Sequence, residues 1–122
     1  MKNREIKFRI IFQNKINGYE RLGKEGWQWM SLQLNPDKGE RWTAGVYPQN
    51  SRYIRKQFIG LKDKNGKDIY HSDFIKDQWG EISEIIWNEN NACFEATKTH
   101  VTEGDMKKSE VIGNIYENNN LI

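Results

Sequence analysis

Large apolar residues alternate with polar residues in the first patterned segment of the chain, residues 5–12. Ile6, Phe8, Ile10 and Phe12 lie on one side of this alternation, and Glu5, Lys7 and Arg9 lie on the other. A period of two is typical of a β-strand with one buried face and one solvated face. The pattern therefore predicts a half-buried strand, followed by a turn at Asn14–Gly18 and a short returning strand at Tyr19–Leu22.

Residues 23–51 have a less regular pattern. Trp27 and Trp29 share one parity and the apolar residues from Met30 onward share the other, which predicts a bulge or a bend between Trp29 and Met30. The run Asn-Pro-Asp-Lys-Gly at 35–39 predicts a turn, because proline fixes φ and glycine accepts a positive φ. We interpret this stretch as an irregular insert that contains one hairpin, and the sequence leaves its detailed fold open.

Several short β-like segments follow the insert. We expect strands at 53–59, 73–76, 81–87, 92–99 and 110–115, with turns at 77–80, at 88–91 and at Asn65–Gly66, whose residues both tolerate a positive φ. One helical turn is expected at 102–109, with Thr102 as its N-cap and Asp105 three residues later. Short strands with little helical periodicity predict one mainly β domain over residues 1–122, built as a small barrel or a sandwich.

Composition excludes several classes of protein. The chain has 122 residues with five Trp, five Tyr and five Phe, which is enough for one domain with a core of its own. No apolar run reaches the roughly 18 residues of a membrane span, and charges interrupt the apolar residues near Met1, so neither a span nor a signal peptide is expected. Cys93 is the single cysteine, which excludes an intrachain disulfide and favours a cytoplasmic location. We expect Cys93 to be a small buried apolar residue.

The charges are divided unevenly along the chain. Residues 1–67 contain 15 Lys/Arg and 6 Asp/Glu, a net charge of +9, whereas residues 68–122 contain 4 and 11, a net charge of −7. Such a division fits attraction within one fold, head-to-tail association of copies, or a basic surface for polyanions. The most basic stretch, 52–67, supplies six candidate binding residues: Arg52, Arg55, Lys56, Lys62, Lys64 and Lys67.

Three segments of the chain resemble, in this order, the YopX family of phage and prophage proteins: Arg4–Arg9, Phe58–Tyr70 and Val111–Asn118. The resemblance covers essentially the whole chain, and its central segment, from Phe58 through Asp63 and Gly66 to Tyr70, is specific. It implies a β-rich fold in which 69–116 form a small SH3-type barrel, with N-terminal strands and the insert, 1–59, packed against it. It also implies a bacterial host cell, and it implies no activity, ligand or catalytic residue.

One position departs from the family pattern. The family has a Tyr-Glu-Gly-Asp run after the central hairpin, where this chain has Tyr70, His71, Ser72 and Asp73. Replacement of the glycine by Ser72 makes a positive-φ turn less expected there. His71 and Asp73 share a strand face, but two ligands do not define a metal site, and a capping role for Asp73 or Ser72 is the better interpretation.

Trp79 is the aromatic residue whose position calls most for an explanation. It stands between Gln78 and Gly80 in a predicted turn, where it either packs back onto the domain or contacts a partner. The lysines of the 60–70 hairpin have two interpretations, a phosphate-contacting finger or a solubilising turn, of which we favour the second.

The sequence contains no nucleophile motif, phosphate-binding loop or metal signature, so we expect no enzyme activity, no catalytic residues, no cofactor and no metal. The leading hypothesis is a non-enzymatic phage or prophage accessory protein that acts through protein contacts. Its partners would be copies of itself, in a homo-oligomer, and a host or phage protein. The alternative is a nucleic-acid-binding module that uses 52–67 together with an aromatic residue of the expected barrel.

Overall fold

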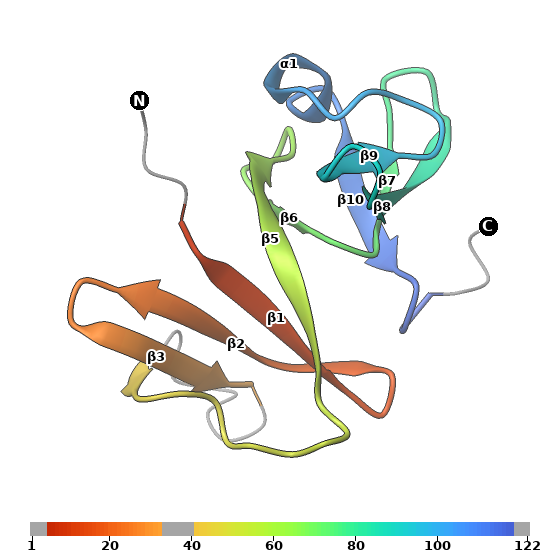
Figure 1. The fold of residues 1–122 in the computed structure, drawn as a ribbon. Coiled ribbons are helices and arrows are strands. Elements are labelled where there is room, and N and C mark those ends of the chain that lie inside the picture. Colours follow the sequence, from red (N-terminus) through yellow and green to blue (C-terminus); the bar gives the residue numbers. More distant parts are fainter. Residues whose placement is uncertain (1–4, 33–40, 119–122) are drawn as a thin grey trace. The chain divides into compact units, whose positions relative to one another are not determined.

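The structure, a computed structural model, describes residues 5–32 and 41–118. The chain divides into two compact units, residues 1–58 (unit 1) and residues 59–122 (unit 2). In the described ranges the protein is mainly β, with 52% of residues in strands and 4% in a helix, and its strands form two antiparallel sheets (Figure 1). No helix of these ranges is long and apolar enough to cross a membrane.

The first sheet has six strands in the order β4-β3-β2-β1-β5-β6. They are β1 (Lys7–Phe12), β2 (Lys15–Gly23), β3 (Gly26–Ser31), β4 (Thr43–Ala44), β5 (Ile54–Lys62) and β6 (Asp68–Tyr70). β5 runs across the boundary between the units, and its first residues, Ile54–Gln57, pair with β1 inside unit 1.

The second sheet lies in unit 2 and has the order β10-β7-β8-β9. Its strands are β7 (Asp73–Lys76), β8 (Ile82–Asn88), β9 (Cys93–Ala96) and β10 (Glu110–Asn114), and α1 (Glu103–Met106) precedes β10. Residues 97–109 connect β9 to β10 without a strand, so the described sheet stays open with β9 and β10 as its edges. The SH3-type barrel implied for 69–116 is therefore not confirmed, because no closed barrel forms in this part of the chain.

Two details of unit 1 differ from the predictions. The first turn is tighter than 14–18, because Gln13 and Asn14 both take a positive φ (50° and 62°) and β2 already begins at Lys15. β3 pairs with β2 without a shift in register, and the irregularity lies instead between β1 and β2, where Ile10 faces Gly18 and Ile11 faces Ile16. The predicted bulge at Trp29–Met30 is thus wrong. Trp29 and Met30 point to opposite faces of a regular strand, and Met30 is buried on its face, so apolar residues can follow one another here without a bulge. The predicted turn at 35–39 lies outside the described residues.

Tyr47 is the central side chain of the unit 1 core, with 2% of its surface exposed. It lies against Gly18, where an added Cβ would come within 2.7 Å of the Tyr47 ring, so the close approach requires glycine. The Tyr47 backbone N–H donates to Glu20 Oε2 (2.6 Å), and the hydroxyl accepts from Asn17 Nδ2 (2.5 Å) and donates to the Asn17 carbonyl (3.1 Å). Burial raises the pKa of the Tyr47 hydroxyl above its ordinary value of about 10.

Two turns of unit 2 have the same construction. Asp63 accepts the backbone N–H groups two and four residues later, both at 2.9 Å, and Asp77 does the same, also at 2.9 Å. In each turn the residue three positions after the aspartate is a glycine with a positive φ, Gly66 at 77° and Gly80 at 86°. Asn65 has no positive φ, so Asn65–Gly66 is not the two-residue hairpin turn that the sequence predicts.

The segments that carry the family resemblance hold unit 2 together. The buried Asp63 carboxylate also accepts the N–H of Val111 at 2.9 Å and so ties its turn to β10. Asn114 Oδ1 accepts from the N–H groups of Tyr116 and Glu117 (3.0 and 2.9 Å), which fixes the turn after β10. These signature residues therefore act as structural anchors, because their polar atoms are directed at the protein's own backbone.

The turn at Ser72 keeps a positive φ without glycine. Ser72 has φ 75°, and its backbone is clamped on both sides, since its N–H donates to the Ile85 carbonyl (2.8 Å) and its carbonyl accepts from Ile115 (3.0 Å). Asp73, fully buried, accepts the N–H of Tyr70 at 2.8 Å. The capping role predicted for Asp73 is confirmed, and the expectation that losing the glycine would remove the positive φ is wrong.

We expect Ser72→Gly to raise the free energy of unfolding by about 0.5–1 kcal/mol. A left-handed backbone conformation costs a non-glycine residue about 1–2 kcal/mol, and glycine would remove this strain. Glycine also makes the unfolded chain more flexible, which cancels part of the stabilisation. Urea denaturation of the two proteins measures the difference. Ser72→Val is the control and should be destabilising, because a β-branched side chain tolerates this φ least. Equal or lower stability of Ser72→Gly would show that the turn is not strained.

Candidate protein-contact site

The six basic candidate residues are divided between the two units. Arg52, Arg55 and Lys56 belong to unit 1, and Lys62, Lys64 and Lys67 belong to unit 2. Three of the six face carboxylates: Arg55 with Glu20 (3.2 Å), Lys62 with Asp68 (3.3 Å) and Lys64 with Glu110 (3.6 Å). The stretch 52–67 is therefore a run of basic residues in the sequence whose charge is partly compensated in the fold.

Trp79 does not pack back onto the domain. It has 76% of its surface exposed, at the tip of the turn between β7 and β8. Its own N–H is held by the Asp77 carboxylate, so the backbone that carries it is fixed while the indole faces solvent. In the matching turn Asn65 takes this position, which shows that the turn itself does not require an aromatic residue. Exposed tryptophan on a rigid turn is typical of a protein-contact residue.

A second aromatic group lies on β8 and β9. Trp87, 43% exposed, packs edge-on against Phe94 with ring centroids 4.9 Å apart, and Phe94 lies 5.5 Å from the His71 ring. Cys93 precedes Phe94 at the start of the edge strand and is exposed. The prediction of a buried Cys93 is thus wrong, because the sequence does not reveal that β9 lies at the edge of its sheet.

β9 has one side that faces no other strand within the described residues, which we call its free edge. Thr97 donates its N–H to the Glu84 carbonyl (3.2 Å), so the β8–β9 pairs that exchange hydrogen bonds are those of Glu95 and Cys93. The intervening residues, Phe94 and Ala96, then direct their backbone N–H and C=O groups away from β8. The free edge thus offers two donors and two acceptors to another extended chain.

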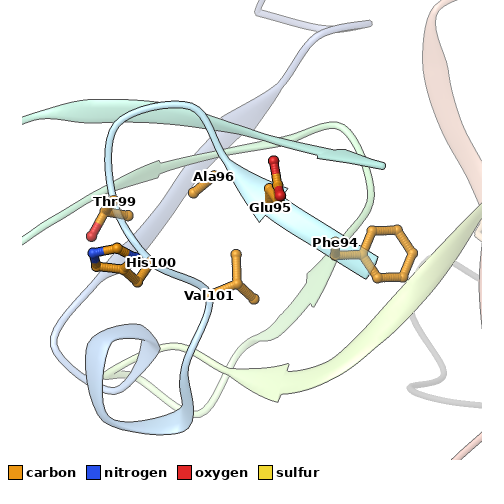
Figure 2. Close-up of a pocket in the computed structure, with 6 residues that line it drawn as sticks. All are labelled: Phe94, Glu95, Ala96, Thr99, His100 and Val101. Carbon is orange, nitrogen blue, oxygen red and sulfur yellow. The ribbon is translucent and has the colours of Figure 1, made fainter. Parts of the chain in front are cut away.

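A hollow of about 260 Å³ lies beside β9 (Figure 2). Its lining residues are Phe94, Glu95, Ala96, Thr99, His100 and Val101. The apolar ones, Phe94, Ala96 and Val101, pack against the unit 2 core and are held in place by it. Among the polar ones, Glu95 accepts from Asn88 Nδ2 at 2.8 Å, which orients its carboxylate.

The arrangement favours contact with an extended polypeptide. Along β9 it combines backbone groups that no strand of the described residues pairs with and an apolar hollow, and these are the two features that an added β-strand uses. Within the described ranges no group of three or more His, Cys, Asp or Glu side chains is placed to hold a metal ion. No signal in the sequence points to this site, because which strand lies at an edge is decided by the pairing of distant segments.

Two comparisons with known proteins found matches to the chain. The family model described as "YopX protein" matches residues 7–122. The crystal structure of protein EF1440 from Enterococcus faecalis is similar, with a TM-score of 0.57 and 17% sequence identity over 95% of this chain and 96% of that chain. At this identity the likeness concerns the fold alone. None of the curated proteins matches the sequence.

Proposed function

The chain belongs to the YopX family, and from that membership we propose that it is a non-enzymatic phage or prophage accessory protein that acts through protein contacts, first of all with copies of itself. The observation that carries the proposal is the charge of the two units. Unit 1 contains 12 Lys/Arg and 5 Asp/Glu, a net charge of +7, and unit 2 contains 7 and 12, a net charge of −5. The boundary between the units thus separates a basic body from an acidic one.

Opposite charges on two bodies favour head-to-tail contacts between copies. Contacts between like units would bring together two charges of the same sign, whereas unit 1 of one copy and unit 2 of the next attract each other. Such a contact is heterologous, because it joins two different surfaces. An open assembly of this kind has a free unit 1 at one end and a free unit 2 at the other, so further copies can add to it. The free edge of β9 and the exposed Trp79 supply unit 2 with contact surface for this association.

Light scattering across ionic strength tests this proposal. Between about 0.01 M and about 1 M salt the Debye length falls from about 30 Å to about 3 Å, so an electrostatic contact weakens strongly. We expect masses that are multiples of 14.5 kDa at low salt and a mass approaching 14.5 kDa at high salt, at tens of micromolar protein. A neutral solute at matched osmolality is the control and should leave the mass unchanged. A mass of one copy at every salt concentration would contradict the proposal.

Nucleic-acid binding through 52–67 is the weaker candidate. Arg55, Lys62 and Lys64 already face carboxylates, and each such pair lowers the charge that phosphates would meet. The twelve acidic residues of unit 2 would repel a polyanion that approached that unit.

A further inference from the structure

β4 is the edge of the first sheet on the unit 1 side, and it has a free edge of the same kind as β9. Gly45 donates its N–H to the Trp27 carbonyl (2.7 Å), so the pair of Trp29 and Thr43 is the next that exchanges hydrogen bonds. Ala44, between them, directs its N–H and C=O away from β3. Thr43 and Ala44 are both exposed, and no strand of the described ranges covers this side.

We propose that the free edge of β9 in one copy pairs with the free edge of β4 in the next copy, so that a sheet continues across the contact. This inference rests on the proposed self-association and names the surfaces that carry it. Unpaired strand edges bind further strands readily, and natural proteins usually protect them.

Charge selects the mixed pairing over pairing of like edges. Glu95 lies in β9, whereas exposed Arg41 lies two residues before β4 and Arg21 stacks on Trp42 at 3.9 Å beside it. Two β9 edges would bring two Glu95 carboxylates together, and two β4 edges would bring two Arg41 groups together. Like charges opposite each other in a sheet are destabilising, and opposite charges are stabilising. The mixed pairing is therefore the one that charge favours.

Apolar surface next to both edges adds to the contact. Val46, 49% exposed, follows β4, and the hollow lined by Phe94 and Val101 lies beside β9. Trp87, 43% exposed, stands on the strand next to β9. Burial of such residues contributes about 25 cal/mol per Å² of apolar surface, in addition to the strand hydrogen bonds.

Two matched proline variants test the pairing. Ala96→Pro and Ala44→Pro each remove one outward-directed N–H and keep the hydrogen bonds to β8 or β3. We expect each variant alone to have the mass of one copy in low-salt sedimentation equilibrium, where the wild-type protein associates. An equimolar mixture should give a species of two copies and nothing larger, because the intact β9 of Ala44→Pro meets the intact β4 of Ala96→Pro.

Ala96→Val and Ala44→Val are the matched controls and should associate like the wild type, since they keep the N–H. Far-UV circular dichroism and thermal unfolding show whether each proline variant is folded. Proline variants that associate like the wild type, or a mixture that stays at one copy, would overturn the strand pairing. A wild-type protein that never associates would instead overturn the proposed function.

Charge exchange provides a test that does not depend on proline. Glu95→Lys and Arg41→Glu should each weaken the association about tenfold, which corresponds to about 1.4 kcal/mol. The double variant should recover most of that loss, because the introduced lysine of one copy would then face the introduced glutamate of the next. Additive weakening in the double variant would show that these two positions do not meet, and the pairing would be wrong.

Discussion

Replacing Asp63 with alanine is expected to lower the free energy of unfolding by about 3 kcal/mol. Its carboxylate is buried and accepts three backbone N–H groups at 2.9 Å, from Asn65, Lys67 and Val111. Hydrogen bonds to a charged acceptor contribute about 1.5–3 kcal/mol each, and a buried donor left without a partner costs about 1–3 kcal/mol. The N–H groups of Asn65 and Lys67 lie in an exposed turn, where water can replace the lost carboxylate as hydrogen-bond acceptor. Val111 is buried, so its N–H would be left without a partner.

Asp77→Ala is a matched control for this prediction. Asp77 accepts the same two turn N–H groups at the same distances, but its turn is exposed and its carboxylate holds only its own turn. We expect a loss of about 1 kcal/mol, so the difference between the two variants isolates the bond to Val111. Equilibrium urea denaturation provides both values. Equal losses would show that the Asp63 bond to β10 adds nothing to stability.

Replacing Tyr47 with alanine should be at least as damaging, with an expected loss of about 4 kcal/mol. The side chain is 2% exposed, and its ring packs edge-on against Trp29 and Tyr53 with centroids 5.5 and 5.3 Å away. Truncation of a buried aromatic residue costs about 3–5 kcal/mol, because the cavity closes only in part. Tyr53→Ala is the control: Tyr53 is only half-buried, so a loss of about 1–2 kcal/mol is expected. Similar losses in both variants would show that Tyr47 is not the centre of this core.

The hydroxyl of Tyr47 adds a pH dependence to the same experiment. Its pKa is raised by burial, so the unfolded chain loses this proton first as the pH rises above about 10. The contribution of the protonated hydroxyl is therefore fully present below about pH 10 and is lost as the pH rises toward the folded-state pKa. Tyr47→Phe keeps the ring and removes the titration, so its stability should fall less steeply there. An identical alkaline loss in both proteins would contradict the assignment to Tyr47.

Local signals in the sequence identify several elements well. The strand at 73–76 and the helical turn capped by Thr102 lie where they are predicted, with the Asp105 N–H donating to Thr102 Oγ1 at 3.1 Å. These elements depend on residues within a few positions of each other, whose preferences are visible in a single sequence. The turn at Asn65–Gly66 is located correctly, but its geometry depends on Asp63, whose carboxylate is engaged by Val111 from 48 positions away.

Properties that depend on position in a sheet are not visible in the sequence. Cys93 and Phe94 are residue types typical of a buried strand, yet they lie in an edge strand. The reason is that residues 97–109 form no further strand beside β9. Trp79 has the same turn around it whether it packs back or faces solvent, and only the fold shows the indole to be 76% exposed. The candidate contact site consists of such properties.

Alternation of apolar residues, turn chemistry and the count of charges belong to the chain itself, so the β class, the YopX membership and the imbalance of charge follow from the order of amino acids. Which strands remain unpaired, which lysines meet a carboxylate and which aromatic rings reach solvent depend on contacts between residues far apart. Those contacts form only when segments are brought together in space. The sequence therefore determined what kind of protein this is, and the tertiary structure decided which backbone edges and side chains it exposes.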